Sequence, residues 1–303
     1  MSYLILIRYQ NLILIALIQV FIRFGLILPM GADITLSNFE FALLVITTIC
    51  LAAAGNIIND INDVSIDKIN KPAQVLIGKK ISEKAGYNLF IILNTIGVGI
   101  GFYLANLIEK PVFSALFILI SALLYLYATY LKSIPFIGNI VISFLVALSL
   151  IIVGLFDLMP AINFLNQDYQ SSAFRMILDY ALFAFMINLI REVVKDIEDI
   201  NGDINGGMNT LPIAIGRKRA SYIAFGLGIV TLFATIFYIY VHLYNYTVAI
   251  LYFLLFIIAP LLYFCTKIWD AKDKNEYQFL SKLLKIIMLL GMCSILLYPF
   301  VIL

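Results

Sequence analysis

Nine apolar runs, each about as long as a membrane is thick, divide this chain of 303 residues. A helix needs roughly 20 consecutive, mostly apolar residues to cross the hydrocarbon core of a bilayer. The runs cover residues of about 9–29, 39–58, 86–107, 112–131, 136–158, 176–195, 220–241, 247–266 and 284–303. The sequence therefore predicts an all-α, polytopic membrane protein with nine transmembrane helices.

The composition excludes several other classes of protein. Hydrophobic residues make up 63% of the chain and charged residues 13%, whereas about a quarter of the residues in a soluble domain are charged. A soluble globular enzyme, a disordered protein and a nucleic-acid binder are excluded. The three cysteines lie far apart in apolar runs and there is a single histidine. Any metal must therefore be held by oxygen ligands.

The basic residues are distributed unequally between the two sides of the predicted bundle. With nine spans, the N-terminus and the loops after spans two, four, six and eight share one side. Of the 20 Lys and Arg residues, only Arg23, Lys110 and Arg175 fall elsewhere. Because Lys and Arg are enriched in cytoplasmic loops, we expect a multi-pass protein of the cell membrane with these loops in the cytoplasm.

Arg23 lies inside the first apolar run, where a charge is costly and is usually paired or functional. Gln19 is one helical turn earlier and shares its face. The alternative is that Arg23 extends to the outer interface and keeps its charge in water.

Two acidic segments follow spans two and six. Each holds three aspartates at i, i+3 and i+7, preceded one turn earlier by Asn or Glu: Asn56, Asp60, Asp63 and Asp67, then Glu192, Asp196, Asp199 and Asp203. On a continuous helix each trio forms one stripe. The equal spacing suggests an internal duplication, with motifs at 56–67 and 192–203, inside a single domain covering residues 1–303.

Like charges on one helix face repel, so each stripe requires a positive partner. Carboxylates select hard cations, and Mg²⁺ is typically held by one or two carboxylates together with substrate phosphates. Two facing stripes therefore predict two Mg²⁺ ions with a diphosphate between them. One alternative is a solvated helix end that pairs with lysines. Another is a cation transporter, although transporter sites normally lie near the bilayer midplane.

The segment Asn59-Asp60-x-x-Asp63-x-x-x-Asp67 resembles the NDxxDxxxD signature of the UbiA superfamily of intramembrane prenyltransferases. The resemblance extends over nearly the whole chain through Asp196-x-x-Asp199-x-x-x-Asp203 and four shorter matches: Arg8-x-x-Asn11, Tyr127-x4-Lys132, Gly138-Asn139 and Thr210-Leu211-Pro212. It implies nine helices around a central cavity. A cytoplasmic cap would be formed by the loops between helices two and three and between helices six and seven.

The resemblance also implies roles for individual residues. Metal ligands would be Asn59, Asp60, Asp63, Asp67, Asp196, Asp199 and Asp203. Catalysis would use the six aspartates with Lys132 and Tyr127. Substrate would be bound by Arg8, Asn11, Asn56, Asn59, Lys71, Lys79, Lys80, Asn139, Glu192 and Lys195. Where many members carry a segment resembling NRPDRPxPSGR, this chain replaces an arginine by Gln74. Diphosphate contacts from that loop are therefore expected from its lysines.

The segment 191–203 resembles most closely the archaeal branch that attaches a second geranylgeranyl chain to a lipid precursor. This implies Mg²⁺-dependent transfer from geranylgeranyl diphosphate to geranylgeranylglyceryl phosphate, with membrane lipids around both substrates. The product would be digeranylgeranylglyceryl phosphate, an archaeal ether-lipid precursor. The alternative within the superfamily is prenylation of an aromatic acceptor in quinone biosynthesis. The alternative of another class remains a cation transporter.

Overall fold

The computed structural model describes residues 1–301, which form helices and no β-strand. The α-helices are α1 (Ser2–Leu6), α2 (Tyr9–Val20), α3 (Asn38–Asn62), α4 (Val64–Asn70), α5 (Glu83–Leu107), α6 (Ser114–Thr129), α7 (Ile137–Val153), α8 (Gln167–Asn205), α9 (Leu211–Ile215), α10 (Arg217–Tyr238), α11 (Thr247–Phe253), α12 (Ala259–Asp270), α13 (Lys274–Cys293) and α14 (Tyr298–Val301). Short π-helical or 3₁₀ segments extend several of them.

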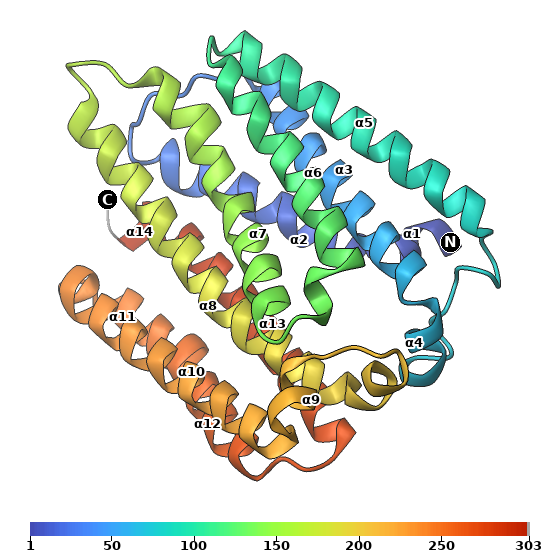
Figure 1. Ribbon diagram of the computed structural model, residues 1–303. Helices are drawn as coiled ribbons and strands as arrows, with labels where there is room; N and C mark the ends of the chain where they lie inside the picture. The colour runs from blue at the N-terminus through green and yellow to red at the C-terminus, as the bar shows by residue number, and fades with distance from the viewer. Residues whose placement is uncertain (302–303) are drawn as a thin grey trace.

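Nine helical spans within the described residues are long and apolar enough to cross a membrane, which confirms the predicted number and order (Figure 1). α8 is the longest, with 39 residues, and extends beyond the predicted run 176–195 at both ends. Hydropathy locates only the part of a helix inside lipid, so the polar continuation that carries the second aspartate trio was outside the predicted span. The last two residues of the ninth run, 302 and 303, lie outside the described residues.

Local sequence signals explain where the helices begin. Ser37 accepts a hydrogen bond from the backbone N–H of Glu40, whose carboxylate in turn accepts from the Ser37 N–H at 2.6 Å. This capping box starts α3, and Asp273 with Glu276 forms another at the start of α13.

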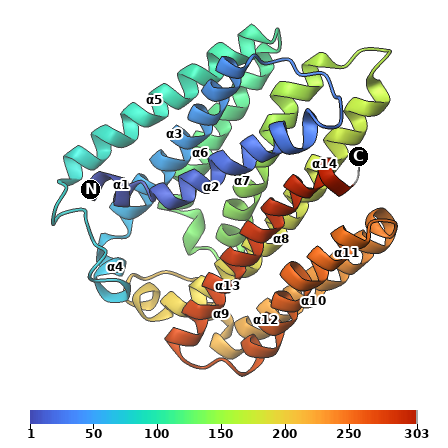
Figure 2. The ribbon, with the colours of Figure 1, turned by 180° about the vertical axis from the view of Figure 1, so that it is seen from behind.

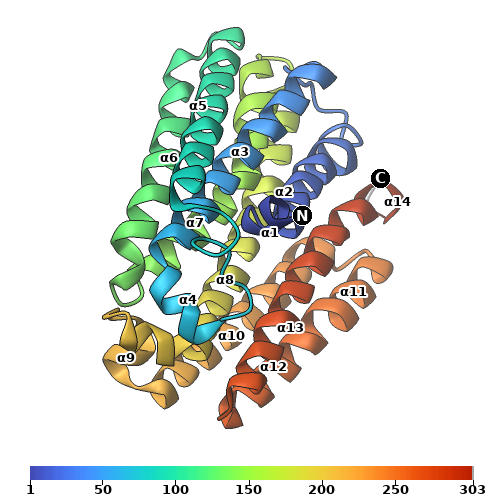
Figure 3. The same ribbon diagram turned by 90° about the vertical axis from the view of Figure 1, so that its right-hand side faces the viewer.

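The spans lie side by side in one bundle, and α8 packs against α7, α10 and α13. α4 and α9 lie together at the same end of the bundle, beyond the ends of α3 and α8 (Figures 1 and 3). The opposite view shows α2 and α13 in front of the other spans (Figure 2). Both segments that follow the aspartate-bearing spans therefore meet at one end of the protein.

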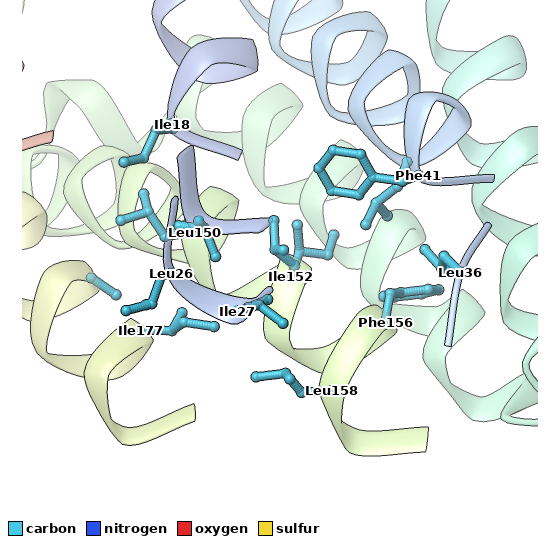
Figure 4. Close-up of a cluster of buried hydrophobic side chains, with 14 of the residues drawn as sticks. Ile18, Leu26, Ile27, Leu36, Phe41, Leu150, Ile152, Phe156, Leu158 and Ile177 are labelled. Atoms are coloured by element: carbon cyan, nitrogen blue, oxygen red, sulfur yellow. The ribbon is translucent and has the colours of Figure 1, made fainter. Parts of the chain in front are cut away.

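A buried apolar cluster packs several spans together away from the end where α4 and α9 lie. It joins the first span, through Ile18 and Leu26, to Leu150 and Phe156 of the fifth span and to Ile177 of α8 (Figure 4). Lipid tails are as apolar as these side chains, so close van der Waals packing is what favours the contact between helices.

Arg23 lies in the first span and is fully buried. Its guanidinium forms an ion pair with Asp157 at 3.0 Å and donates to the Leu36 carbonyl at 2.6 Å, while the Phe41 ring centroid lies 4.5 Å away. The Asp157 carboxylate also accepts from the Leu36 N–H at 3.0 Å. Arg23 therefore does not extend to the interface, and its partner is a charge that sequence inspection did not connect with it.

We expect Arg23→Gln to destabilise the protein by about 3–5 kcal/mol, because it leaves the Asp157 carboxylate buried without a cation. The double variant Arg23→Met/Asp157→Leu removes both charges and should lose less stability than the two single variants together. Thermal unfolding in detergent measures both effects. Arg175→Gln, an exposed change on α8, is the control. Strict additivity of the two single changes would contradict the pairing.

Candidate active site

A cavity of about 880 Å³ lies inside the bundle. Among the described residues, every span except that of α5 contributes to its wall. All six predicted aspartates line it, as do Tyr127 and Lys132. The structure therefore brings together residues from helices that are far apart in the sequence.

The first aspartate trio does not lie on one continuous helix. α3 ends at Asn62 and α4 begins at Val64, so the chain bends at Asp63. Asp63 forms an ion pair with Lys132 and accepts from the Asn59 amide at 2.7 Å. Asp67 follows on α4 and still lines the cavity. All three carboxylates line the cavity wall in spite of this bend.

Arg8 neutralises the first carboxylate of this trio. Its guanidinium lies 2.7 Å from Asp60. Arg8 separates α1 from α2 and has a φ of 55°, in the left-handed region that residues other than glycine seldom adopt. The backbone break places this side chain beside α3, so that the first span and the first aspartate trio are linked by charge.

The second trio does lie on one helix, because α8 continues to Asn205. Asp196 accepts from the Asn139 amide at 2.8 Å. Asp199 forms an ion pair with Lys71 at 2.6 Å, and Asp203 is buried. Lys71 comes from the segment that follows the first trio, so its ion pair with Asp199 connects that segment to the second trio.

Lys132 is placed by a close backbone contact. It lies in the 3₁₀ turn Leu131–Ser133, next to the start of α7. A Cβ on Gly138 would be 2.8 Å from the Cα of Lys132. Only glycine permits this approach, which explains why the Gly138-Asn139 match matters: it brings Lys132 to Asp63 and Asn139 to Asp196.

Asn70 fastens the end of α4 to α8. Its amide donates to the Asp199 carbonyl at 2.8 Å and accepts from the Gly202 N–H at 2.9 Å. A Cβ on Gly202 would overlap this amide. The Lys274 ammonium donates to the Asn70 carbonyl at 2.9 Å, which adds the start of α13 to the junction. These contacts join the segment after the second span to α8 and to the start of α13; the cytoplasmic cap expected from the two loops stays a prediction.

Burial and neighbouring charges alter the pKa values of Asp67 and Lys71, which follow the second span. Burial, followed by the negative charge of Asp63, raises the pKa of Asp67 to about 6 although Lys71 opposes the shift. For Lys71, burial lowers the pKa, but the ion pair with Asp199 and the nearby Glu198 and Asp67 outweigh it and leave the pKa raised. The site therefore favours positively charged partners.

The other predicted substrate-binding residues divide into two groups. Asn11, Asn56, Asn59, Glu192 and Lys195 line the cavity. Lys79 and Lys80 are exposed and do not contribute to its wall, and the Lys79 ammonium donates to the Pro72 carbonyl at 3.0 Å. Other residues of the same loop, Lys71, Gln74 and Leu76, do line the cavity.

The wall also contains polar residues that were not predicted, among them Asn70, Arg191 and Lys285. The sequence held a signal for two of them. Arg191 is one turn before Lys195 on the helix of the second trio, and Lys285 is a charge inside the ninth apolar run. A charge at such a position is usually functional.

The donor set fits a hard cation that shares its coordination with a ligand. Among residues 1–301, no group of three or more His, Cys, Asp or Glu side chains is arranged to hold one ion by itself. One buried oxygen of Asp199, Oδ1, has no hydrogen-bond partner. Mg²⁺ commonly takes one or two carboxylates and completes its shell with substrate phosphate and water, and the cavity offers oxygen ligands of this kind.

Residues 1–301 form a bundle of nine spans in which carboxylates from α3, α4 and α8 face one internal cavity, and this arrangement defines an intramembrane protein with a polar site inside the bundle. Residues 19–297 match the UbiA prenyltransferase family. The chain belongs to this family, which makes it a prenyltransferase and a multi-pass membrane protein. The family predicted from the aspartate motifs is confirmed.

Relatives in several archaea support this assignment. The digeranylgeranylglyceryl phosphate synthase of Thermococcus gammatolerans is 34% identical over 218 residues, 70% of this chain and 71% of the relative. The enzyme of the same name from Korarchaeum cryptofilum is 33% identical over 250 residues, 82% of this chain and 81% of the relative.

Solved structures share the fold. One, from work on digeranylgeranylglyceryl phosphate synthase in membranes, is 24% identical with a TM-score of 0.66 and covers 98% of this chain and 97% of its own. A UbiA homolog from Archaeoglobus fulgidus bound to GPP and Mg²⁺ is 17% identical with a TM-score of 0.59, covering 97% and 99%. The predicted bundle around a central cavity is therefore confirmed.

We expect Gly202→Ala to destabilise the protein by about 1–3 kcal/mol, because the new methyl group displaces the buried Asn70 amide from its partners. Gly226→Ala is the matched control: it lies inside α10 with open space around it, so the higher helix propensity of alanine should leave stability unchanged or raise it. Thermal unfolding in detergent compares the two.

The double variant Asn70→Ala/Gly202→Ala removes the overlap together with the amide. It should therefore be no less stable than Asn70→Ala alone. If the two changes instead act independently, Gly202 does not act through Asn70.

Proposed function

We propose that the protein transfers a geranylgeranyl group from geranylgeranyl diphosphate to geranylgeranylglyceryl phosphate and so forms digeranylgeranylglyceryl phosphate. The observation that carries the proposal is the shared name of relatives that are about a third identical over two thirds or more of the chain. The polar cavity supports it, because the cavity holds carboxylates for a metal–diphosphate and cations that no metal would require.

Two Mg²⁺ ions form part of the proposal. Asn59, Asp60, Asp63 and Asp67 would hold one, and Asp196, Asp199 and Asp203 the other. When bound, Mg²⁺ neutralises charge on the diphosphate and so favours cleavage of its bond to the allylic carbon. The solved homolog from Archaeoglobus fulgidus is described with Mg²⁺ and GPP, and the oxygen donors of this chain fit the same ion.

Cationic side chains would hold the departing diphosphate. Lys132 forms an ion pair with Asp63, and Lys71 forms one with Asp199. Arg8 forms an ion pair with Asp60. Each of these cations therefore lies beside a carboxylate that we propose as a metal ligand. Such preorganised charges stabilise the negative charge that develops on the leaving oxygen. Asn56 and Asn139 supply neutral polar contacts at the same wall.

The rest of the wall is suited to the prenyl chain. Phe117, Leu124, Phe183 and Ile257 are among its apolar residues, and they exclude water from an allylic cation. Tyr127 lines the polar part, where its ring can stabilise positive charge. The carbon–oxygen bond to diphosphate breaks and diphosphate leaves. The acceptor hydroxyl oxygen then forms the ether bond to the allylic carbon, and its proton passes to an aspartate or to the released diphosphate.

The proposed reaction is tested by supplying the purified enzyme with Mg²⁺, radiolabelled geranylgeranyl diphosphate and one acceptor at a time. Label should enter geranylgeranylglyceryl phosphate and should not enter a hydroxybenzoate or naphthoate. Chelation with EDTA should abolish transfer. Label in the aromatic product alone would replace the proposed acceptor by the quinone-type alternative, and cation flux in liposomes without diphosphate release would indicate a transporter.

Asp63→Asn and Asp199→Asn provide the matched test of the two aspartate trios. Each should lower turnover by roughly 10²–10³-fold, the effect of removing one key electrostatic group at a reaction centre. Asp168→Asn, at the opposite end of α8, should retain the wild-type rate. Full activity of either trio variant would show that its trio is only a solvated helix face.

The site is proposed to face the cytoplasm, because the Lys- and Arg-rich loops lie on the same side as both aspartate trios. Single cysteines at the exposed positions Ser65, Asn205 and Asn245 in a cysteine-free background report the orientation. An impermeant maleimide added outside should label position 245 only. Labelling at positions 65 and 205 with none at 245 would reverse the assignment.

A further inference from the structure

The polar wall of the cavity has two regions of opposite charge. The region around the two trios holds six aspartates against Arg8, Lys71 and Lys132. The second region, which we call the Arg191 cluster, consists of Arg191, Glu192, Lys195, Lys285 and Asn11. It contains three cations and one carboxylate, so its excess charge is positive where that of the first region is negative.

One carboxylate serves two of these cations. Glu192 accepts from Arg191 at 3.0 Å and from Lys195 at 2.9 Å, and its side chain is 8% exposed. All three residues lie on α8 and precede Asp196 by five, four and one residues. A single negative charge cannot balance both cations, so the cluster retains positive charge.

Lys285 adds a further cation from α13. Its ammonium donates to the Asn11 side-chain oxygen at 2.7 Å, and it forms no ion pair with any described residue. It lies within electrostatic reach of Arg191. The buried Nε of Arg191 has no hydrogen-bond partner. The cluster therefore combines uncompensated charge with unused donors, which is costly in this environment unless an anion binds there.

We propose that the Arg191 cluster binds the phosphate group of the acceptor, with Arg191 and Lys285 as its cationic contacts. The inference rests on the proposed function and identifies which residues select that acceptor. A phosphate monoester carries a charge close to −2 at neutral pH, which matches the excess of the cluster. A neutral phenol would leave this charge unbalanced.

The position of the cluster suits the reaction. Arg191 precedes Asp196 by five residues on α8, a rise of about 8 Å along the helix. The free hydroxyl of the acceptor is on the glycerol carbon next to the one that bears phosphate. An acceptor with its phosphate at Arg191 would therefore have its hydroxyl within reach of the aspartate trios, where the proposed reaction requires it.

The test compares two acceptors that differ only in the phosphate: geranylgeranylglyceryl phosphate and geranylgeranylglycerol. Arg191→Gln and Lys285→Met should each raise KM for the phosphorylated acceptor by roughly 10- to 100-fold, the effect of losing a charge-assisted hydrogen bond. KM for geranylgeranyl diphosphate should stay within about twofold. With geranylgeranylglycerol, the variants should match wild type, since no phosphate remains to be bound.

Asn11→Asp is a nearly isosteric variant that retains the contact with Lys285 but neutralises the charge of the ammonium. This variant should weaken binding of the phosphorylated acceptor and leave binding of geranylgeranylglycerol unchanged. The controls are Lys282→Met, an exposed lysine one turn from Lys285, and Arg175→Gln on α8. Titration of geranylgeranylglyceryl phosphate in EDTA supplies a measurement that is independent of turnover: wild type should bind without metal, and the cluster variants should not.

The outcomes separate the inference from the function on which it rests. If wild type transfers label to geranylgeranylglyceryl phosphate but the variants keep its KM, the phosphate binds elsewhere and the inference is wrong. If the variants lose activity equally with both acceptors, the cluster has a purely structural role, and the inference is also wrong. If wild type uses neither glyceryl lipid, the proposed function fails and the inference fails with it.

Discussion

Six aspartate side chains around one cavity repel one another, and the folded arrangement depends on what opposes that repulsion. Arg8, Lys132 and Lys71 lie against Asp60, Asp63 and Asp199, and the Asn139 amide lies against Asp196. Each of these groups comes from a different segment than the carboxylate it contacts. The positions of the first span, the turn before α7 and the loop after α3 are thus all tied to the charge of the site.

This charge distribution also gives the two regions of the cavity wall different binding properties. In the proposed reaction the excess carboxylates bind the metal and through it the diphosphate, whereas the excess cations bind the acceptor phosphate directly. Two anionic lipids can then occupy one chamber without competing for the same groups. Lys195 and Asp196 are neighbours in sequence but belong to different regions, so the two regions adjoin directly on α8.

Hydropathy was sufficient to predict the nine spans of the described residues and their order, because an apolar run fills each span. Motif spacing was sufficient to predict the aspartates of the cavity wall, because the spacing follows the helical repeat. Contacts between distant segments were not readable. Asp157 is 134 residues from Arg23, and Lys285 is 274 residues from Asn11. The bend at Asp63 was missed for a local reason: the spacing fits a helix, whereas the chain must turn there to cover the cavity.

The separation of Arg23 from its partner bears on how the chain enters the membrane. The first span is synthesised well before the fifth, so its guanidinium meets the lipid before Asp157 exists. Arg23 lies four residues before the end of the first span, Tyr9–Ile27, and an arginine inside a span raises the free energy of inserting an isolated helix. Leu36 and Asn38 are only 13 and 15 residues away and are the groups that arrive next. They can shelter the charge during synthesis, until the fifth span arrives and completes the pair.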